Sequence, residues 1–293
     1  MRLILCLLMV SLLLPGCFRR WVMTDKELKE YYKGKTNKPT YFTIKNDSVE
    51  LFCATAGVDT LPPLLLIHGA PGAWYGSRNF LEDSQLLRNF HVIAIDRLGY
   101  NKSKFKGKRK AVTSIQIQSV AIHEALRLNR SFKTGVVVGS SYGAPIAANI
   151  AILYPGEFHH VVMLAGAIDP DNEKFWWWSG LLRGGPLKWM LPHFLKMSTD
   201  EKNTHVKQLQ WMLPRWTELS VPITVVQGGA DEIVKPVNLD FAKAKLKDKE
   251  AEFIFLPEAG HMIRWQHPDL VKKIILGSLP ESRALPVAAG ASQ

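Results

Sequence analysis

The sequence VVVGSSYGAP, at residues 136–145, places Ser141 at the centre of the pattern G-x-S-x-G. The valines before it are typical of a strand buried in a parallel sheet, and the Ala- and Ile-rich stretch after it is typical of a helix packed on that sheet. A sharp turn between strand and helix is the setting in which this pattern exposes a serine hydroxyl for nucleophilic attack. We therefore predict that Ser141 is a nucleophile, and that the neighbouring Ser140, around which the two glycines do not fit, is not.

The aspartate and the histidine that a serine nucleophile requires follow two later apolar runs. Asp231 comes just after 223–226, and His261 comes just after 253–256. A serine hydroxyl reacts at neutral pH when a base removes its proton and a carboxylate orients that base. Reactive side chains in parallel sheets gather at the carboxyl ends of the strands. The sequence therefore predicts a triad of Ser141, His261 and Asp231.

Apolar strand patterns alternate with helical patterns over most of the chain. An opening hairpin at 41–57, followed by strand–helix alternation, predicts a mostly parallel, doubly wound α/β sheet. The alternation stops between 169 and 219, where six of the nine tryptophans gather, which predicts a helical cap inserted over the sheet. The expected buried strands are 64–67, 92–95, 136–138, 161–164, 223–226 and 253–256, and the expected helices are 114–128, 144–154, 237–246 and 268–276.

Five short motifs follow one another on these elements: HGAPG (68–72), DRLGYNKS (96–103), GSSYG (139–143), GGADEIV (228–234) and AGHMIRWQHP (259–268). With these motifs, residues 40–278 resemble the α/β-hydrolase superfamily, whose triad runs in the order serine, acid, histidine. The resemblance implies the α/β-hydrolase fold and an oxyanion hole made by the backbone N–H groups of Ala70 and Tyr142. It also implies that His68 shapes the oxyanion loop. Asp169 is left as an alternative acid, because some members carry the acid after the sixth strand.

The resemblance implies a serine hydrolase that cleaves a small-molecule carboxylic ester through an acyl-enzyme. An apolar acyl or alcohol part would suit the Trp-, Leu- and Met-rich cap. Dehalogenases and epoxide hydrolases of the superfamily carry an aspartate at the nucleophile position, so Ser141 argues against both. Ala70 and the turn at 96–99 depart from the H-G-G-P-G and D-Q-R-G of the iminopeptidase-like branch. An aminopeptidase or amidase, a C–C hydrolase and a haloperoxidase-like enzyme of the same fold stay open as alternatives, as does a non-catalytic envelope binding protein.

No cofactor and no metal are expected. The chain lacks G-x-G-x-x-G and Gly-Lys-Ser/Thr turns, and it shows no cluster of His, Cys and Asp at metal-ligand spacing. Cys53 lies in an expected strand, and we predict that it fills the core.

The first residues predict export and a lipid anchor. Met1-Arg2 is a short basic start, residues 3–14 have the length of a signal h-region, and Leu14-Pro15-Gly16-Cys17 follows. This ending resembles the bacterial lipoprotein signal, which implies lipidation of Cys17, and an ordinary secretory signal or an uncleaved anchor is the alternative. Because Phe18 follows rather than Asp, the resemblance implies the outer membrane of a bacterial cell envelope, facing the periplasm.

At 293 residues, 47% of them apolar, the chain is long enough for one large α/β domain. We expect a signal peptide at 1–16, a tether at 17–40, a hydrolase domain at 41–278 with its cap at about 170–219, and a disordered tail at 279–293. The formal net charge is +11, and six of the nine residues from 102 to 110 are basic. In an exported protein this basic stretch favours anionic lipid over nucleic acid as a partner, or it is a solvated loop without a partner.

Overall fold

The computed structural model describes residues 22–106, 110–173, 188 and 191–280. The chain divides into two compact units, Met1–Lys38 and Pro39–Gln293. In the first unit, helix α2 (Asp25–Tyr31) begins with a capping box, in which Thr24 and Glu27 accept each other's backbone N–H. A helix therefore stands inside the segment predicted as a tether. The predicted signal with Cys17, and residues 281–293 of the predicted tail, lie outside the described residues.

A sheet of nine strands runs through the described part of the second unit. Its order is β1-β2-β4-β3-β6-β7-β8-β9, with β5 paired to β2. Neighbours from β4 to β9 are parallel, whereas β1 and β2 are antiparallel to each other and β2 is antiparallel to β4. This is the mostly parallel, doubly wound sheet that the sequence predicts. The bounds are β1 Thr40–Lys45, β2 Val49–Ala56, β3 Pro63–Ile67, β4 His91–Ile95, β5 Lys104–Phe105, β6 Gly135–Ser140, β7 Phe158–Leu164, β8 Ile223–Gly228 and β9 Ala251–Leu256.

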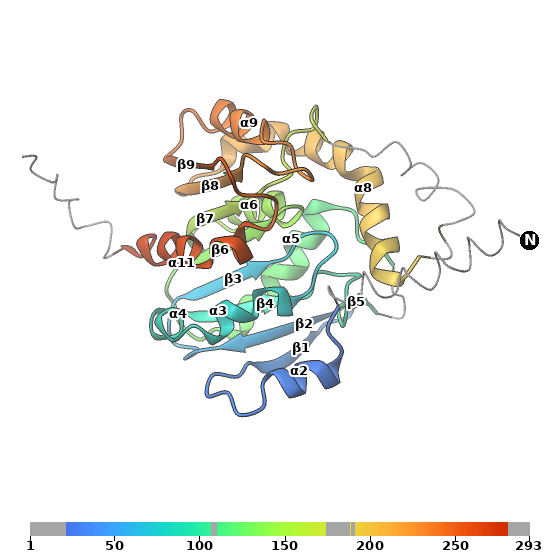
Figure 1. Cartoon of the computed structure of the whole chain (residues 1–293), viewed down its shortest axis with the longest axis vertical. Coiled ribbons are helices and arrows are strands. Elements are labelled where there is room, and N and C mark those ends of the chain that lie inside the picture. Colours follow the sequence, from blue (N-terminus) through green and yellow to red (C-terminus); the bar gives the residue numbers. More distant parts are fainter. Residues whose placement is uncertain (1–21, 107–109, 174–187, 189–190, 281–293) are drawn as a thin grey trace, which may run out of the picture. The chain divides into compact units, whose positions relative to one another are not determined.

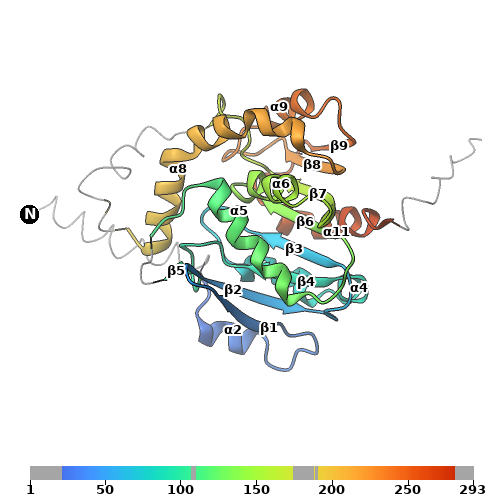
Figure 2. The same cartoon turned by 180° about the vertical axis from the view of Figure 1, so that it is seen from behind.

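Helices cover both faces of the sheet. Figure 1 shows α3 (Arg78–Glu82), α4 (Ser84–Asn89) and α11 (Pro268–Gly277) in front of it. Figure 2 shows α5 (Ile115–His123) and α6 (Gly143–Leu153) in front of the opposite face. The remaining described helices are α8 (His193–Met212), α9 (Asn238–Lys245), α10 (Ile263–Gln266) and the 3-10 turns η1 (Trp74–Ser77), η2 (Glu124–Leu128) and η4 (Leu213–Glu218).

The register of the parallel strands brings the motif-bearing loops to one edge of the sheet. In β6, Gly139 pairs with Ile67 of β3, and Ser140 pairs with Leu164 of β7. Gly228 of β8 pairs with the last residue of β9. The strands therefore end at matching levels, and the loops that follow them start side by side. The valines of β6 are at most 3% exposed, which fits a strand with a neighbour on each side and a helix layer on each face.

The predicted strands, the opening hairpin and the four predicted helices are all present, and several extend a few residues beyond the apolar runs. The helix predicted for 114–128 divides into α5 and η2. The sequence did not predict α3, α4 or β5, and β5 lies within the basic stretch, where Lys104 pairs with Glu50 at 3.4 Å. Of the predicted cap, the structure describes α8 and η4, whereas four of its tryptophans lie outside the described residues.

Candidate active site

Ser141 stands on the turn between β6 and α6 in a backbone conformation that serine rarely adopts. Its φ is +54°, in the left-handed region that crowds the Cβ of any residue except glycine. Its N–H donates to the carbonyl oxygen of Leu164 at 2.8 Å, and its carbonyl oxygen accepts the N–H of Ala144 at 2.9 Å. These hydrogen bonds from β7 and α6 hold the strained residue in place. The strand, turn and helix form the elbow that the G-x-S-x-G pattern needs.

Close packing explains the glycines around this turn. A Cβ on Gly139 would lie 2.2 Å from the carbonyl oxygen of Gly143, and a Cβ on Gly143 would lie 2.7 Å from that of His68. A Cβ on Gly69 would lie 2.9 Å from Cβ of Ser141 and 3.5 Å from its Oγ. The loop after β3 therefore borders the serine hydroxyl, which is where an oxyanion loop is required.

Asp231 and His261 form a close pair between the loops after β8 and β9. Nδ1 of His261 lies 2.8 Å from Oδ2 of Asp231. The other carboxylate oxygen accepts the N–H groups of Ile233 and Val234 at 2.9 and 2.8 Å, and Asp231 is buried. Because Nδ1 donates its proton to the carboxylate, Nε2 is the nitrogen left to act as a base.

The alternative acid, Asp169, is engaged elsewhere. Its carboxylate accepts the N–H of Asp171 at 2.9 Å and the side-chain amide of Asn172 at 2.8 Å. Within the described part of the chain the Ser141 hydroxyl makes no hydrogen bond, to His261 or to any other group. The structure thus brings Asp231 and His261 together and leaves the serine–histidine hydrogen bond unformed. Catalytic hydrogen bonds often tighten only when substrate is bound.

His68 lies in the loop after β3, the predicted oxyanion loop, and its hydrogen bonds hold this loop in place. It is buried, its Nε2 accepts the N–H of Arg97 at 3.0 Å, and Nδ1 therefore carries the proton that it donates to the carbonyl oxygen of Gly69 at 2.7 Å. Burial, together with the charge of Arg97, lowers the pKa of His68 well below its usual range. The ring is consequently neutral, as both hydrogen bonds require. Ala70 follows Gly69 in this loop and is joined to Pro71 by a cis peptide bond.

Arg97, in the loop after β4, fixes the direction of the same backbone. Its Nε donates to the carbonyl oxygen of His68 and its Nη2 to that of Gly69, both at 3.0 Å. The C=O of Gly69 and the N–H of Ala70 belong to one peptide plane and point in opposite directions when that peptide is trans. Only Ala70–Pro71 is cis among the described peptide bonds. Binding the Gly69 oxygen therefore aims the N–H of Ala70 away from Arg97.

Glu201 of α8 neutralises Arg97 inside the protein. Its two carboxylate oxygens accept Nη1 and Nη2 of Arg97 at 2.5 and 3.0 Å, and the hydroxyl of Tyr100 donates to it at 2.6 Å. The side chains of the ion pair are 0% and 1% exposed. Burial by itself would lower the pKa of Arg97, but the charge and hydrogen bond of Glu201, together with Tyr100 and Tyr142, raise that pKa overall. The motif containing Arg97 was visible in the sequence, but Glu201 sits among the polar residues of the insertion and gives no such signal.

Tyr142, the other predicted donor, is held by the same helix. It is buried, its hydroxyl donates to the carbonyl oxygen of Thr113 at 3.1 Å, and its ring stacks on His205 with centroids 4.4 Å apart. The guanidinium of Arg97 lies 4.8 Å from the centre of the Tyr142 ring. Glu201 and His205 are four residues apart, so they share one face of α8. One face of α8 therefore contacts both Arg97, which orients the N–H of Ala70, and Tyr142, which carries the other predicted oxyanion donor.

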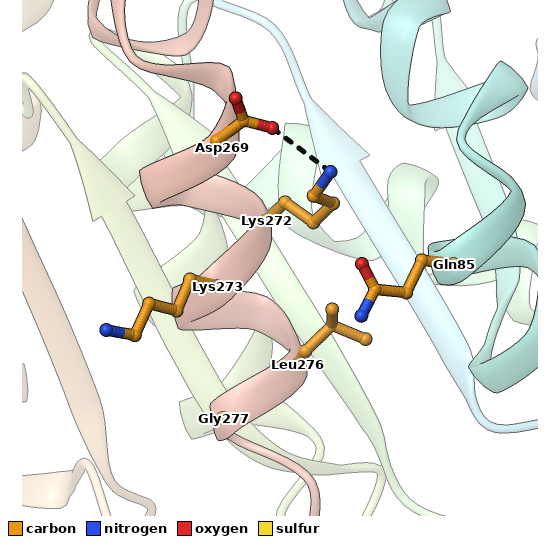
Figure 3. A pocket seen from close by; sticks show the side chains of 6 residues that line it. All are labelled: Gln85, Asp269, Lys272, Lys273, Leu276 and Gly277. Atoms are coloured by element: carbon orange, nitrogen blue, oxygen red, sulfur yellow. Dashed lines mark ion pairs between the residues drawn. The ribbon is translucent and has the colours of Figure 1, made fainter.

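The described residues contain no cluster of three or more His, Cys, Asp or Glu side chains that could hold a metal. None of their helices combines the length and the apolar composition that a membrane span requires. A surface pocket lies beside α11, where Lys272 pairs with Asp269 at 3.1 Å (Figure 3). Lys272 also pairs with Asp83 at 3.2 Å. The pocket contains none of the residues predicted for catalysis, because its lining is Gln85, Asp269, Lys272, Lys273, Leu276 and Gly277.

The sequence from the third strand to the last helix has known relatives. Residues 64–274 match the alpha/beta hydrolase family. The chain belongs to this family. Lipase 1 of Psychrobacter immobilis is 22% identical over 273 residues, which cover 82% of this chain and 84% of the lipase. Epoxide hydrolase 3 of Mus musculus is 28% identical over 123 residues, which cover 42% of this chain and 32% of that protein.

The first curated relatives align over only part of their own lengths, between 31% and 38%. Among solved structures, a membrane phospholipase A described as a bacterial virulence factor superposes with a TM-score of 0.67. The match covers 97% of this chain and 100% of that one at 18% identity. At this identity the likeness concerns the fold, which is the α/β-hydrolase fold that the sequence predicts.

The buried ion pair gives a prediction for stability. Glu201→Ala leaves the guanidinium of Arg97 buried without its counter-ion, so we expect a loss of about 3–5 kcal/mol in the free energy of unfolding. Asp200→Ala is the matched control, because the neighbouring Asp200 pairs with Lys188 at a site where both side chains are about one-third exposed, and its loss should stay below about 1 kcal/mol. Urea unfolding of the three proteins measures both values, and equal losses would contradict the role assigned to Glu201.

Proposed function

We propose that this protein is a serine hydrolase that cleaves carboxylic esters through an acyl-enzyme. Oγ of Ser141 attacks the ester carbonyl while Nε2 of His261 takes its proton, and Asp231 keeps the imidazole in the required tautomer. The alcohol leaves with that proton. Water, deprotonated by His261, then attacks the acyl-enzyme, and the acid leaves as the proton returns to Ser141. The observation that carries the proposal is the part-buried Asp231–His261 hydrogen bond on loops that leave the same edge of the sheet as the strained Ser141 elbow.

The oxyanion of each tetrahedral intermediate would be bound by the N–H groups of Ala70 and Tyr142. Tyr142 directly follows the nucleophile, and the N–H of Ala70 is aimed by the contacts of Arg97 and His68 with Gly69. Preorganised N–H donors of this kind contribute roughly 3–4 kcal/mol each to stabilising a transition state.

An ester is the substrate class best supported by the relatives. A lipase aligns over most of the chain, and a phospholipase A shares its fold. Epoxide hydrolases also align, but in that branch the nucleophile is an aspartate and here it is Ser141. We therefore propose an ester with an apolar acyl or alcohol part, and activity on a panel of 4-nitrophenyl esters against aminoacyl 4-nitroanilides separates an esterase from an aminopeptidase or amidase.

The assignment of the nucleophile is tested by replacing each of two adjacent serines with alanine. Ser141→Ala removes only a small hydroxyl, so we expect a fall of about a thousandfold or more in kcat with an unchanged unfolding midpoint. Ser140→Ala is the matched control and should cost far less. Labelling by a fluorophosphonate should likewise disappear only in Ser141→Ala. Equal losses, or a larger loss in Ser140→Ala, would show that the nucleophile has been misassigned.

The acid is tested by comparing two aspartates. Asp231→Asn removes the charge that holds the proton on Nδ1 of His261, so kcat should fall by several orders of magnitude. Asp169→Asn, which changes a carboxylate bound to neighbouring amides, should have a mild effect. If Asp169→Asn proves the more damaging change in steady-state kinetics, the acid belongs after β7.

We also propose that the chain is exported and anchored by lipid on Cys17, in a bacterial cell envelope at the outer membrane. The support is the apolar run at 3–14 followed by Leu14-Pro15-Gly16-Cys17. A diacyl anchor together with the basic stretch at 102–110 would bind a membrane stably, whereas a single chain binds only marginally.

The anchor predicts that the mature protein stays with membranes at high salt and enters the detergent phase on partition. Cys17→Ser should stop lipidation and leave the protein either soluble or held by an uncleaved signal. Mass spectrometry of the amino-terminal peptide is the decisive measurement. A wild-type protein that is soluble and unmodified at this end would exclude the anchor and leave the proposed chemistry unaffected.

A further inference from the structure

Arg264 is a buried cation that the proposed mechanism does not use. It lies on α10, three residues after His261, and is 7% exposed. Its Nη1 donates to the hydroxyl of Ser77 at 2.7 Å. Its Nε is buried without a hydrogen-bond partner, and no described residue accepts a hydrogen bond from Nη2. Nε and Nη2 form one edge of the planar guanidinium, so a complete two-donor edge is left unused.

No described carboxylate compensates this charge. Burial, followed by the charge of another cation, Arg78, lowers the pKa of Arg264 to about 10. Arg264 is therefore still protonated at neutral pH. Arg97 offers the contrast within the same chain, because Glu201 supplies its counter-ion and its pKa is raised. Buried charges are normally paired, since leaving a cation uncompensated in the interior costs several kcal/mol.

Arg264 lies beside the candidate active site. Three residues of chain span at most about 11 Å, so its Cα lies within that distance of the Cα of His261. A Cβ on Gly76 would lie 3.0 Å from Nη2 of Arg264, and Gly76 follows the loop that borders Ser141. The charge of Arg264 also contributes, after burial and Arg97, to the lowered pKa of His68. The segment after β3 thus contacts both groups, because its Gly69 borders Ser141 and its Gly76 borders Arg264.

We propose that the unused edge of Arg264 binds an oxyanion group, a carboxylate or a phosphate, carried by the ester substrate. The inference rests on the proposed function and narrows its substrate class to esters that bear a negative charge a few bonds from the scissile carbonyl. A guanidinium edge matches the two oxygens of such a group with two parallel, charge-assisted hydrogen bonds. The guanidinium carbon lies 4.5 Å from the centre of the Trp265 ring, and no described residue accepts a hydrogen bond from the Nε–Nη2 edge. Binding would supply the counter-ion that the described residues lack.

The kinetic test compares two esters that differ in one charge. Mono-4-nitrophenyl glutarate and 4-nitrophenyl pentanoate share a leaving group and a five-carbon acyl chain, but only the glutarate ester carries a carboxylate. We expect kcat/KM of the wild type to favour the glutarate ester about tenfold or more, because only this ester can accept charge-assisted hydrogen bonds from Arg264. Arg264→Gln should abolish this preference and leave kcat/KM for the pentanoate ester nearly unchanged.

Two control variants distinguish hydrogen bonding by the guanidinium edge from a non-specific effect of positive charge. Arg88→Gln removes one positive charge from an exposed position on α4 and should keep the preference. Arg264→Lys keeps the positive charge but lacks the two parallel N–H donors of the guanidinium, so it should retain only part of the preference for the glutarate ester. A wild type without preference, or an Arg264→Gln variant that slows both esters equally, would overturn the proposal.

A binding measurement separates this inference from the proposed chemistry. Ser141→Ala protein, titrated calorimetrically with glutarate and with inorganic phosphate, should bind at least one of them, and Arg264→Gln should abolish the binding. Such binding supports the anion site even if neither ester is hydrolysed and the proposed function fails. Binding of free anions together with hydrolysis that shows no preference for the charged ester would assign the site to a free anion and overturn the substrate assignment. No binding of either anion, with an Arg264→Gln variant at least as stable as the wild type, would make Arg264 an uncompensated structural cation and overturn the proposal.

Discussion

The guanidinium of Arg97 connects parts of the chain that meet only in the folded protein. Through hydrogen bonds it holds two carbonyl oxygens of the loop after β3, through an ion pair it holds Glu201 of α8, and through its face it contacts Tyr142. Each contact depends on the others, because a buried guanidinium is tolerated only when its donors and its charge are satisfied together. The loop after β3, the Ser141 elbow and helix α8 are consequently stabilised as one network rather than as three separate structures.

The sequence predicted the features that local physics determines. Apolar runs such as 136–138 became buried strands because a residue covered on both faces of a sheet has to be apolar. Asp231 and His261 were found because parallel strands end at one edge, which makes a position just after a strand informative. The missed elements have weaker local signals. The strand β5 has only two residues and depends on its pairing with β2.

Long-range partners could not be predicted from residue type. Glu201 lies 104 positions from Arg97, and nothing in its neighbourhood distinguishes it from the exposed acids of a polar helix. Arg264 belongs to the motif at 259–268, which is informative because of His261 three residues earlier, yet the burial of Arg264 and its missing counter-ion appear only in three dimensions. Two arginines with the same intrinsic chemistry thus have opposite surroundings, one with a full set of internal partners and one with an open edge. Both arginines look alike in the sequence, where each is simply one positively charged residue.

The stack of Tyr142 on His205, beside the Arg97–Glu201 pair, limits which parts of the molecule can move during turnover. Swinging α8 away from the sheet would separate two buried charges and two stacked rings in one step, so we expect this helix to keep its position during turnover. Substrates that differ in bulk have to be accommodated without displacing it. Substitutions that change substrate specificity are then expected at side chains outside the face of α8 that carries Glu201 and His205. A change on that face would also disturb Arg97 and Tyr142.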